Sequence, residues 1–162
     1  MMRTALETPR LILRPFREED AGDVYEYAWD PRVGPIAGWM PHANIEESRE
    51  IIRTVFSRPG VFAMELRQTG RVIGSVGFVG NHPAGESQNV PDDEVGYALS
   101  PAQWGRGLML EAVEAVLEYG FTQPGLRRIW CGHYAGNWRS SRVIGKCGFR
   151  YRFSRTEYVS LV

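Results

Sequence analysis

The feature of this sequence that most constrains its fold is a short glycine-containing turn between a strand-like run and a helical pattern. Residues 95–99 are typical of a strand, Pro101 breaks that pattern, and apolar side chains recur at helical spacing over residues 108–119. The sequence WGRG at residues 104–107 therefore joins a strand to the first turn of a helix. Unpaired amides and the positive end of the helix dipole meet at such a point, and glycine lets a ligand approach the backbone. The turn either binds a phosphate group or is a tight connection that binds nothing, and these residues alone leave both interpretations open.

Length and composition predict one globular domain over residues 1–162. The apolar fraction is 43%, which is enough for a core. The chain carries 19 basic and 19 acidic side chains, and a net charge of zero argues against nucleic acid or an anionic membrane as a partner. No run approaches the roughly 20 apolar residues that span a bilayer, and the N-terminus has no apolar signal core. We therefore expect a cytoplasmic protein. Cys131 and Cys147 lack the CxxC spacing of a metal or redox pair, so we expect both to be buried small side chains.

Alternating hydrophobic patterns predict the order of the elements. Strands are expected over residues 10–16, 61–67, 71–79, 92–99 and 127–134, and helices over residues 18–29, 44–56, 108–119 and 137–146. A last strand, or a poorly formed pair, is expected over residues 149–159. Because antiparallel hairpins precede a β-α-β crossover, the order predicts an α/β (α+β) fold. Its centre would be a mixed, mostly antiparallel sheet of six or seven strands with helices on both faces.

Local signals refine two of these elements. Asn44 and Glu47 form a capping-box pattern at the start of the second helix. That helix is expected to bury its apolar residues, which are Ile45, Ile51, Ile52 and Val55. The preceding segment, residues 34–42, contains Trp39 and Met40 among prolines and glycines, so it either packs over the core or lines a ligand cleft. The loop at residues 80–93 is either a substrate gate or a surface insertion.

Several other kinds of site are not supported by the sequence. A dinucleotide-binding turn needs a third glycine where Leu110 stands, and the P-loop pattern is absent. The three histidines lack the spacing of metal ligands, so we expect no metal.

Three blocks occur in the order found in a known enzyme family. They are TPRLILRPF at residues 8–16, EVGY at residues 94–97 with WGRG at residues 104–107, and NWRSSRVIGKCGF at residues 137–149. Together they resemble the GCN5-related N-acetyltransferases (GNAT), in the branch of ribosomal-protein N-terminal acetyltransferases of the RimJ/RimL type. The resemblance covers nearly the whole chain. It implies the GNAT fold, acetyl-CoA as donor, a primary amine as acceptor and direct transfer in a ternary complex.

The resemblance also implies which residues bind the donor. The turn would hold the pyrophosphate of acetyl-CoA through Trp104, Gly105, Arg106, Gly107, Leu108 and Met109. Met109 stands where the family usually has Gly or Ala, so its side chain must point away from the phosphates. The family has a bulge in the strand before the turn, which places an oxyanion donor at Ala98 or Leu99.

A second group of residues would carry the chemistry. In the family, the residue at Asn137 contacts the pantetheine arm, and Ser140 lies near the sulfur, where it can protonate the leaving thiolate. Both are equally explained as cap and first-turn residues of a helix. Glu94, the last acid before an apolar strand, is the candidate general base or a solvent-facing acid. Tyr97 joins Glu94 and Ser140 as a candidate catalytic residue.

The acceptor is the least determined feature. The branch implies a protein N-terminal α-amine, whereas a polyamine, an amino acid or an antibiotic amine is the alternative. Trp29, Trp39 and His42 are the candidate acceptor contacts. A non-catalytic acyl-CoA-binding module is a further alternative. Because residues 149–162 leave little room for a closing pair of strands, a homodimer that completes the sheet remains open.

Overall fold

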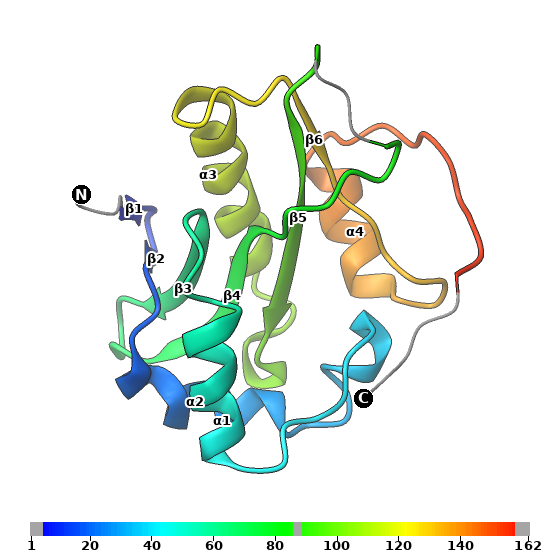
Figure 1. Ribbon diagram of the computed structural model, residues 1–162. Helices are drawn as coiled ribbons and strands as arrows, with labels where there is room; N and C mark the ends of the chain where they lie inside the picture. The colour runs from blue at the N-terminus through cyan, green and yellow to red at the C-terminus, as the bar shows by residue number, and fades with distance from the viewer. Residues whose placement is uncertain (1–4, 86–88, 158–162) are drawn as a thin grey trace.

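The structure is a computed structural model that describes residues 5–85 and 89–157 (Figure 1). Its centre is a six-stranded sheet in the order β1-β2-β3-β4-β5-β6. The strands are β1 (Leu6–Glu7), β2 (Leu11–Arg14), β3 (Val61–Leu66), β4 (Val72–Phe78), β5 (Asp92–Leu99) and β6 (Arg128–Trp130). Neighbouring strands are antiparallel, except that β5 and β6 are parallel. The predicted mixed, mostly antiparallel sheet is therefore confirmed.

Helices lie on both faces of this sheet, as predicted. The described residues form four α-helices, α1 (Ala21–Ala28), α2 (Ile45–Thr54), α3 (Leu108–Thr122) and α4 (Trp138–Lys146), and 3-10 turns at Glu18–Asp20, Pro35–Ala37 and Pro101–Gln103. α1 and α2 pack on one face, α3 packs on the other, and α4 lies at the β6 side (Figure 1). Among the described residues, no helix combines the length and apolarity needed to span a bilayer.

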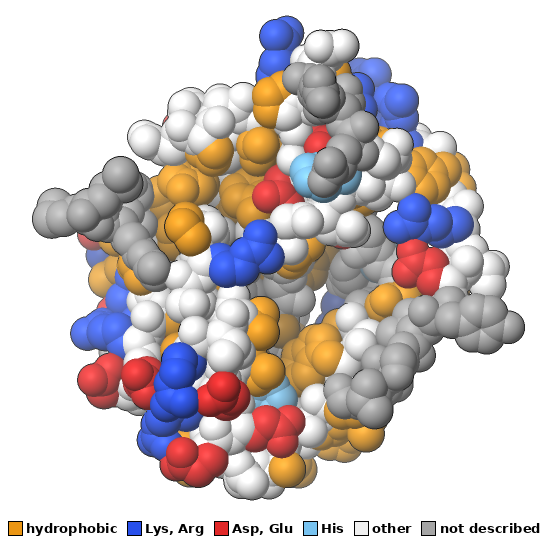
Figure 2. Space-filling view, viewed as in Figure 1, with side chains coloured by type: hydrophobic (Ala, Val, Ile, Leu, Met, Phe, Trp, Pro, Cys, Tyr) orange, Lys and Arg blue, Asp and Glu red, His pale blue; other side chains and the backbone are white. Residues whose placement is uncertain are grey.

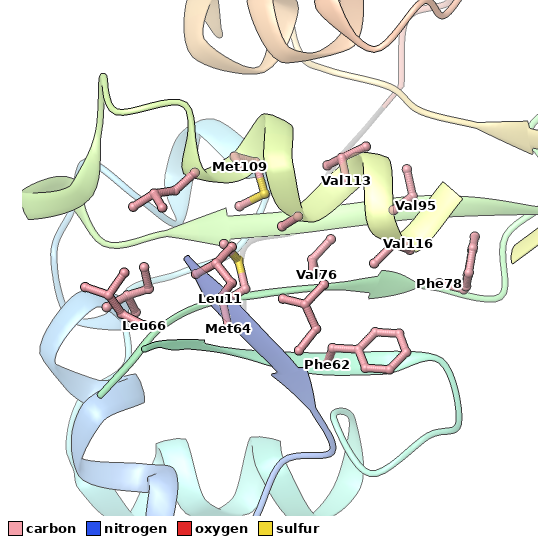
Figure 3. Close-up of a cluster of buried hydrophobic side chains, with 14 of the residues drawn as sticks. Leu11, Phe62, Met64, Leu66, Val76, Phe78, Val95, Met109, Val113 and Val116 are labelled. Atoms are coloured by element: carbon pink, nitrogen blue, oxygen red, sulfur yellow. The ribbon is translucent and has the colours of Figure 1, made fainter. Parts of the chain in front are cut away.

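The larger core lies between the sheet and α3. Met64 and Val76 from the sheet face Val113 and Val116 from α3, and all four are almost completely buried (Figure 3). Each such side chain contributes about 1.5–3 kcal/mol of transfer free energy. A second core on the opposite face contains residues of α1, α2 and the segment before α1. The two cores hold β5 between them and so define which face each of its side chains occupies.

The C-terminal part of the chain differs from the prediction. β6 has only three residues. α4 ends at Lys146, and Gly148 follows its C-cap residue Cys147 with a φ of +85°, which suits glycine at this position. Residues 149–157 form no strand, so the strand predicted over residues 149–159 is wrong for the described part, and residues 158 and 159 lie outside it. Side-chain contacts replace strand pairing, because Phe153 packs edge-on against Trp130 with ring centroids 5.8 Å apart. At the other end, β1 is a strand that the sequence did not predict.

Helix α2 begins as predicted but buries less than predicted. The Asn44 side chain accepts a hydrogen bond from the Glu47 amide at 2.8 Å, which confirms the cap. Only Ile52 of the four predicted apolar residues is fully buried, whereas Ile45 and Val55 are 42% and 47% exposed. The reason is geometric, because the buried face is one narrow stripe that Ile52 shares with Ser48, four residues earlier.

A buried ion pair connects β2 to the turn before α1. Both outer guanidinium nitrogens of Arg14 donate to Asp20 at 2.9 Å, and its Nε donates to Glu65 at 2.9 Å. Burial by itself raises the pKa of Asp20. The hydrogen bonds from Arg14 and from the Arg17 amide lower it by more than burial raises it, so the pKa of Asp20 lies below its usual value. Asp20 is the last of three consecutive acids at residues 18–20, and it serves this tertiary contact.

Candidate active site

The glycine turn leads into α3 with its amides uncapped. Gly105 and Gly107 have φ values of +78° and +75°, a left-handed conformation that favours glycine. Gly107 is the N-cap residue of α3, and the part of the chain that the structure describes provides no side-chain capping hydrogen bond there. The side chain of Met109 points into the core and is 5% exposed, which is the orientation required for amides to face a phosphate (Figure 3). The turn therefore presents free main-chain donors at the positive end of a long helix.

The N-terminal segment of the chain holds this turn in place. One carboxylate oxygen of Glu111 accepts hydrogen bonds from the Thr8 hydroxyl at 2.6 Å and the Arg10 amide at 2.9 Å. The other accepts from Arg10 Nε at 2.9 Å, and Arg10 Nη1 donates to the carbonyl oxygen of Arg106 at 2.8 Å. Burial raises the pKa of Glu111, but these hydrogen bonds outweigh it and leave the pKa below its usual value. Sequence reasoning missed this network, although Thr8, Arg10 and Glu111 all lie in the stretches that it singled out.

Within residues 5–85 and 89–157, the edge of β5 that faces β6 is only partly paired. β6 pairs with residues 92–94 alone, so the two strands separate after Glu94. The Ser100 amide donates a hydrogen bond to the carbonyl oxygen of Ile73 on β4. Along a strand, the amides of every second residue point to the same side. The amide of Ala98, two residues before Ser100, therefore also faces β4. The amides of Tyr97 and Leu99 therefore point to the side from which β6 has departed.

This geometry corrects two expectations about the oxyanion donor. The register between β4 and β5 runs without a shift from Val95 to Leu99, so the bulge expected there is not present. The Ala98 amide is directed at β4, which moves the candidate donor to Tyr97 or Leu99. Leu99 is held in place through its carbonyl oxygen, which accepts a hydrogen bond from Trp104 Nε1 at 3.0 Å.

Tyr97 and the start of α4 meet across this gap. The hydroxyl oxygens of Tyr97 and Ser140 lie 2.7 Å apart, and Ser140 is 6% exposed. The Asn137 side chain accepts a hydrogen bond from the Ser140 amide at 3.2 Å, so it is the N-cap of α4. Burial is the main cause that raises the pKa of Tyr97 well above its usual value, so the phenol is neutral and can donate a proton. Nearby, burial raises the pKa of the half-buried Cys131 thiol to about 12.

A second contact ties α4 to the glycine turn. The guanidinium of Arg139 lies 3.6 Å from the centroid of the Trp104 ring, and that of Arg32 lies 5.6 Å from it. Such cation–π contacts contribute about 0.5–2 kcal/mol each. Trp104 thus joins the end of β5, the start of α4 and the segment after α1. Figure 2 shows the surface hollowed between the sheet and the side of the molecule that carries α4.

Glu94 lies on the other face of β5 from Tyr97. Side chains alternate along a strand, and Tyr97 packs with the α3 core while Ala98 packs with the α1 core. Glu94 shares the face of Ala98. Its Oε1 accepts a hydrogen bond from Asn81 Nδ2 at 2.6 Å, and its Oε2 lies beside Gly132, 3.4 Å from where a β-carbon would be. A carboxylate and a pair of hydroxyls therefore flank the partly unpaired strand from opposite sides.

The family model described as "Acetyltransferase (GNAT) domain" matches residues 10–150. The chain belongs to the GNAT acetyltransferase family. A relative of this acetyltransferase, the uncharacterized N-acetyltransferase YoaA of Bacillus subtilis (strain 168), is 31% identical over 150 residues, covering 90% of this chain and 82% of YoaA. A GNAT-family acetyltransferase structure from Bacillus anthracis has a TM-score of 0.75 at 24% identity and covers 91% of this chain and 84% of that one. The structure of Mycobacterium smegmatis RimJ in complex with CoA-disulfide has a TM-score of 0.74 at 21% identity. The match covers 98% of this chain and 79% of the RimJ chain.

Membership of the GNAT family makes this protein an N-acetyltransferase. The partly unpaired stretch of β5 in this acetyltransferase is a place where an extended ligand can form main-chain hydrogen bonds, as an added strand does. The uncapped turn at Gly107 lies at the end of the same strand and suits a phosphate group. The described residues thus fit a long, phosphate-bearing donor.

The three candidate acceptor residues of the acetyltransferase have different environments. Trp29, the C-cap residue of α1, is 50% exposed. Trp39 is half-buried against the α1 core, so the segment at residues 34–42 packs on the core. Gly38 of this segment also abuts the ring of Tyr134, which lies between β6 and α4. His42 is 9% exposed and is hydrogen-bonded through Nδ1 to Ser48 Oγ at 2.8 Å. Burial lowers the pKa of His42, so the ring is neutral at pH 7 and stabilises the loop.

Proposed function

We propose that this GNAT enzyme transfers the acetyl group of acetyl-CoA directly to a protein N-terminal α-amine within a ternary complex. The observation that carries the proposal is the placement of Glu94 and the Tyr97–Ser140 pair on opposite faces of β5. Acyl transfer from a thioester to an amine needs a base on the amine side and an acid on the sulfur side. The partly unpaired stretch of β5 lies between these groups, where the thioester carbonyl would be held.

Binding of the donor would use main-chain groups. The amides of Gly107, Leu108 and Met109 would hold the diphosphate, with Gly105 and Arg106 completing the turn and Trp104 holding it to β5. The pantetheine arm would lie along β5 and contact Asn137. The amide of Tyr97 or Leu99 would stabilise the oxyanion. Acetyl-CoA supplies an activated acyl group, and these residues orient it.

Proton transfer would use the two faces of β5. Glu94 would take a proton from the incoming ammonium group through a water molecule, which leaves a neutral amine to attack the carbonyl carbon. The carbon–nitrogen bond forms, the carbon–sulfur bond breaks, and the departing thiolate receives a proton from Ser140. Tyr97 would replace that proton on Ser140 through their 2.7 Å hydrogen bond. The second proton lost by the attacking nitrogen would return through water to Tyr97, whose pKa is raised by burial, so that the phenol is again protonated.

Support for a protein N-terminus comes from the RimJ-type resemblance and from the structural likeness to RimJ of Mycobacterium smegmatis. Trp29, Met40 and Tyr134 are exposed apolar side chains in the segments that follow α1 and β6, and such side chains suit a peptide better than a polyamine. A polyamine site would be expected to gather several acids. Trp29 and Trp39 are the proposed contacts to the peptide.

Release of CoA tests the proposal. The enzyme is mixed with acetyl-CoA and either peptides with free N-termini, the same peptides with blocked N-termini, or small amines including spermidine. Turnover with free N-termini alone is the expected result, and faster turnover with spermidine would contradict the acceptor assignment. Binding of acetyl-CoA by calorimetry without turnover of any amine would indicate a non-catalytic module.

Two substitutions test the roles of individual groups. Glu94→Gln and Ser140→Ala should each lower kcat by about 100-fold or more, the range for loss of a general acid or base. The matched control is Glu118→Gln on the exposed face of α3, which should retain full activity. Unchanged turnover in Glu94→Gln would refute the base assignment.

A further inference from the structure

The side chain of Asn81 directs the carboxylate of Glu94. The distance from Asn81 Nδ2 to Glu94 Oε1 is 2.6 Å. A carboxylate only accepts hydrogen bonds, so the amino end of the amide must face it. With Oε1 engaged, the second oxygen is the one beside Gly132, at the point where β5 and β6 separate. The contact therefore distinguishes the two carboxylate oxygens and turns one of them toward the gap.

The backbone that carries Asn81 is itself anchored to the start of β5. Asp93 Oδ1 accepts hydrogen bonds from the amides of Gly80 at 2.8 Å and Asn81 at 3.2 Å. The next residue, His82, lies 2.6 Å through Nδ1 from Asp92 Oδ1. Each residue of the segment 80–82 thus contacts one of the consecutive acids at the start of β5. Because the backbone of Asn81 is fixed relative to β5, little further backbone entropy is lost when its side chain binds Glu94.

Sequence reasoning gave the loop at residues 80–93 two roles, a gate or a surface insertion. Residues 80–82, at the start of that loop, are hydrogen-bonded to the strand that carries the candidate base. Positioned groups contribute to catalysis by keeping reacting atoms in line, and a displacement of about 1 Å can cost about 100-fold in rate. When a base acts through a bridging water, its carboxylate must be aligned with the water, and the water must be aligned with the amine.

We infer that Asn81 is a positioning residue for Glu94 in the acetyl-transfer reaction. The inference rests on the proposed function, in which Glu94 is the general base. Asn81 holds Oε1 in place, and Oε2 receives the proton of the acceptor ammonium group through water. In this role the effect of Asn81 passes through the carboxylate of Glu94, which it contacts directly.

A double-mutant cycle in the full-length chain tests this role. Asn81→Ala should lower kcat with an N-terminal peptide by about tenfold or more and leave the KM for acetyl-CoA within about twofold. Asn81→Asp keeps the shape but places a second carboxylate against Glu94, so it should be slower than Asn81→Ala. In the Glu94→Gln background, Asn81→Ala should cause no further loss, because residues that act as a unit are not additive. Gln68→Ala, an exposed amide on the β3–β4 turn, is the matched control.

The outcomes separate this inference from the proposed function. Full activity of Asn81→Ala beside a slow Glu94→Gln variant would overturn the inference and leave the base assignment intact. A further loss in the double variant equal to that in the single one would also overturn it, because Asn81 would then act independently of Glu94. Unchanged turnover in Glu94→Gln would overturn the base assignment first and the inference with it. A purely structural role would appear as a lowered melting temperature with proportional loss of active sites, which active-site titration with acetyl-CoA detects.

Discussion

Glu111→Gln should destabilise the protein at neutral pH by about 2 kcal/mol. The carboxylate accepts three hydrogen bonds at 2.6–2.9 Å from Thr8 and Arg10, and a hydrogen bond to a charged group contributes about 1.5–3 kcal/mol. Gln retains one acceptor oxygen, and the Arg10 guanidinium is half-exposed, so its share is screened by solvent. The net loss is close to one such bond. For a chain of this size, that corresponds to a fall in melting temperature of about 4–8 °C.

The pH dependence gives this prediction a signature that a simple packing defect lacks. The pKa of Glu111 is lower in the folded protein than its usual value of 4.5. A depressed folded-state pKa contributes stability that is fully present above the unfolded-state pKa and is lost as the pH falls through the folded-state pKa. The difference in unfolding free energy between wild type and Glu111→Gln should therefore be constant from pH 7 to about pH 5.5 and shrink below pH 4.5.

Urea unfolding followed by circular dichroism at pH 7, 5.5 and 4 measures that difference. Glu118→Gln, on the exposed face of the same helix, is the control and should change stability by less than about 0.5 kcal/mol at each pH. A loss at pH 7 no larger than that of the control would refute the assigned role of the network. So would a difference that stays the same at pH 4.

Three further substitutions test the fold around the site. Asp20→Asn leaves the buried guanidinium of Arg14 without its bidentate partner and should cost about 3 kcal/mol in chemical denaturation, whereas a loss below about 1 kcal/mol would count against a buried pair. Met109→Ala should lower the unfolding free energy by about 2–5 kcal/mol and Met109→Leu by less than about 1.5 kcal/mol. If the two variants lowered the melting temperature equally, the Met109 side chain would not be in the core. At Gly107 there is room for the methyl group of alanine, since the nearest atom, Arg10 Nη2, lies 3.6 Å away. Gly107→Ala should therefore lower the unfolding free energy by about 1–2 kcal/mol only because alanine disfavours the left-handed backbone. An unchanged unfolding midpoint would contradict that conformation.

Much of the fold could be predicted because its signals are local. The cap at Asn44 and the glycine at the end of α4 depend on residues within one helical turn of each other. The turn before α3 was also predictable, since a strand pattern, a break and a helical pattern follow one another directly. The prediction failed where a segment has weak local preference, as in residues 149–157, whose contacts with Trp130 and the loop at Pro83 take the place of strand pairing.

The residues by themselves determined the order of the elements from β2 to α4 and the glycine turn, whereas the resemblance to the family supplied the candidate acid and base. Only the tertiary structure decided which core lies on the side of Tyr97 and which on the side of Glu94. It also decided that the amides of Tyr97 and Leu99 rather than Ala98 point toward the gap, and that Asn81 donates a hydrogen bond to Glu94. The physical reason is that periodicity and capping are properties of neighbouring residues. Strand pairing and contacts such as that of Glu111 with Thr8 join segments far apart in the chain, and only the packing of the whole sheet sets which of them meet.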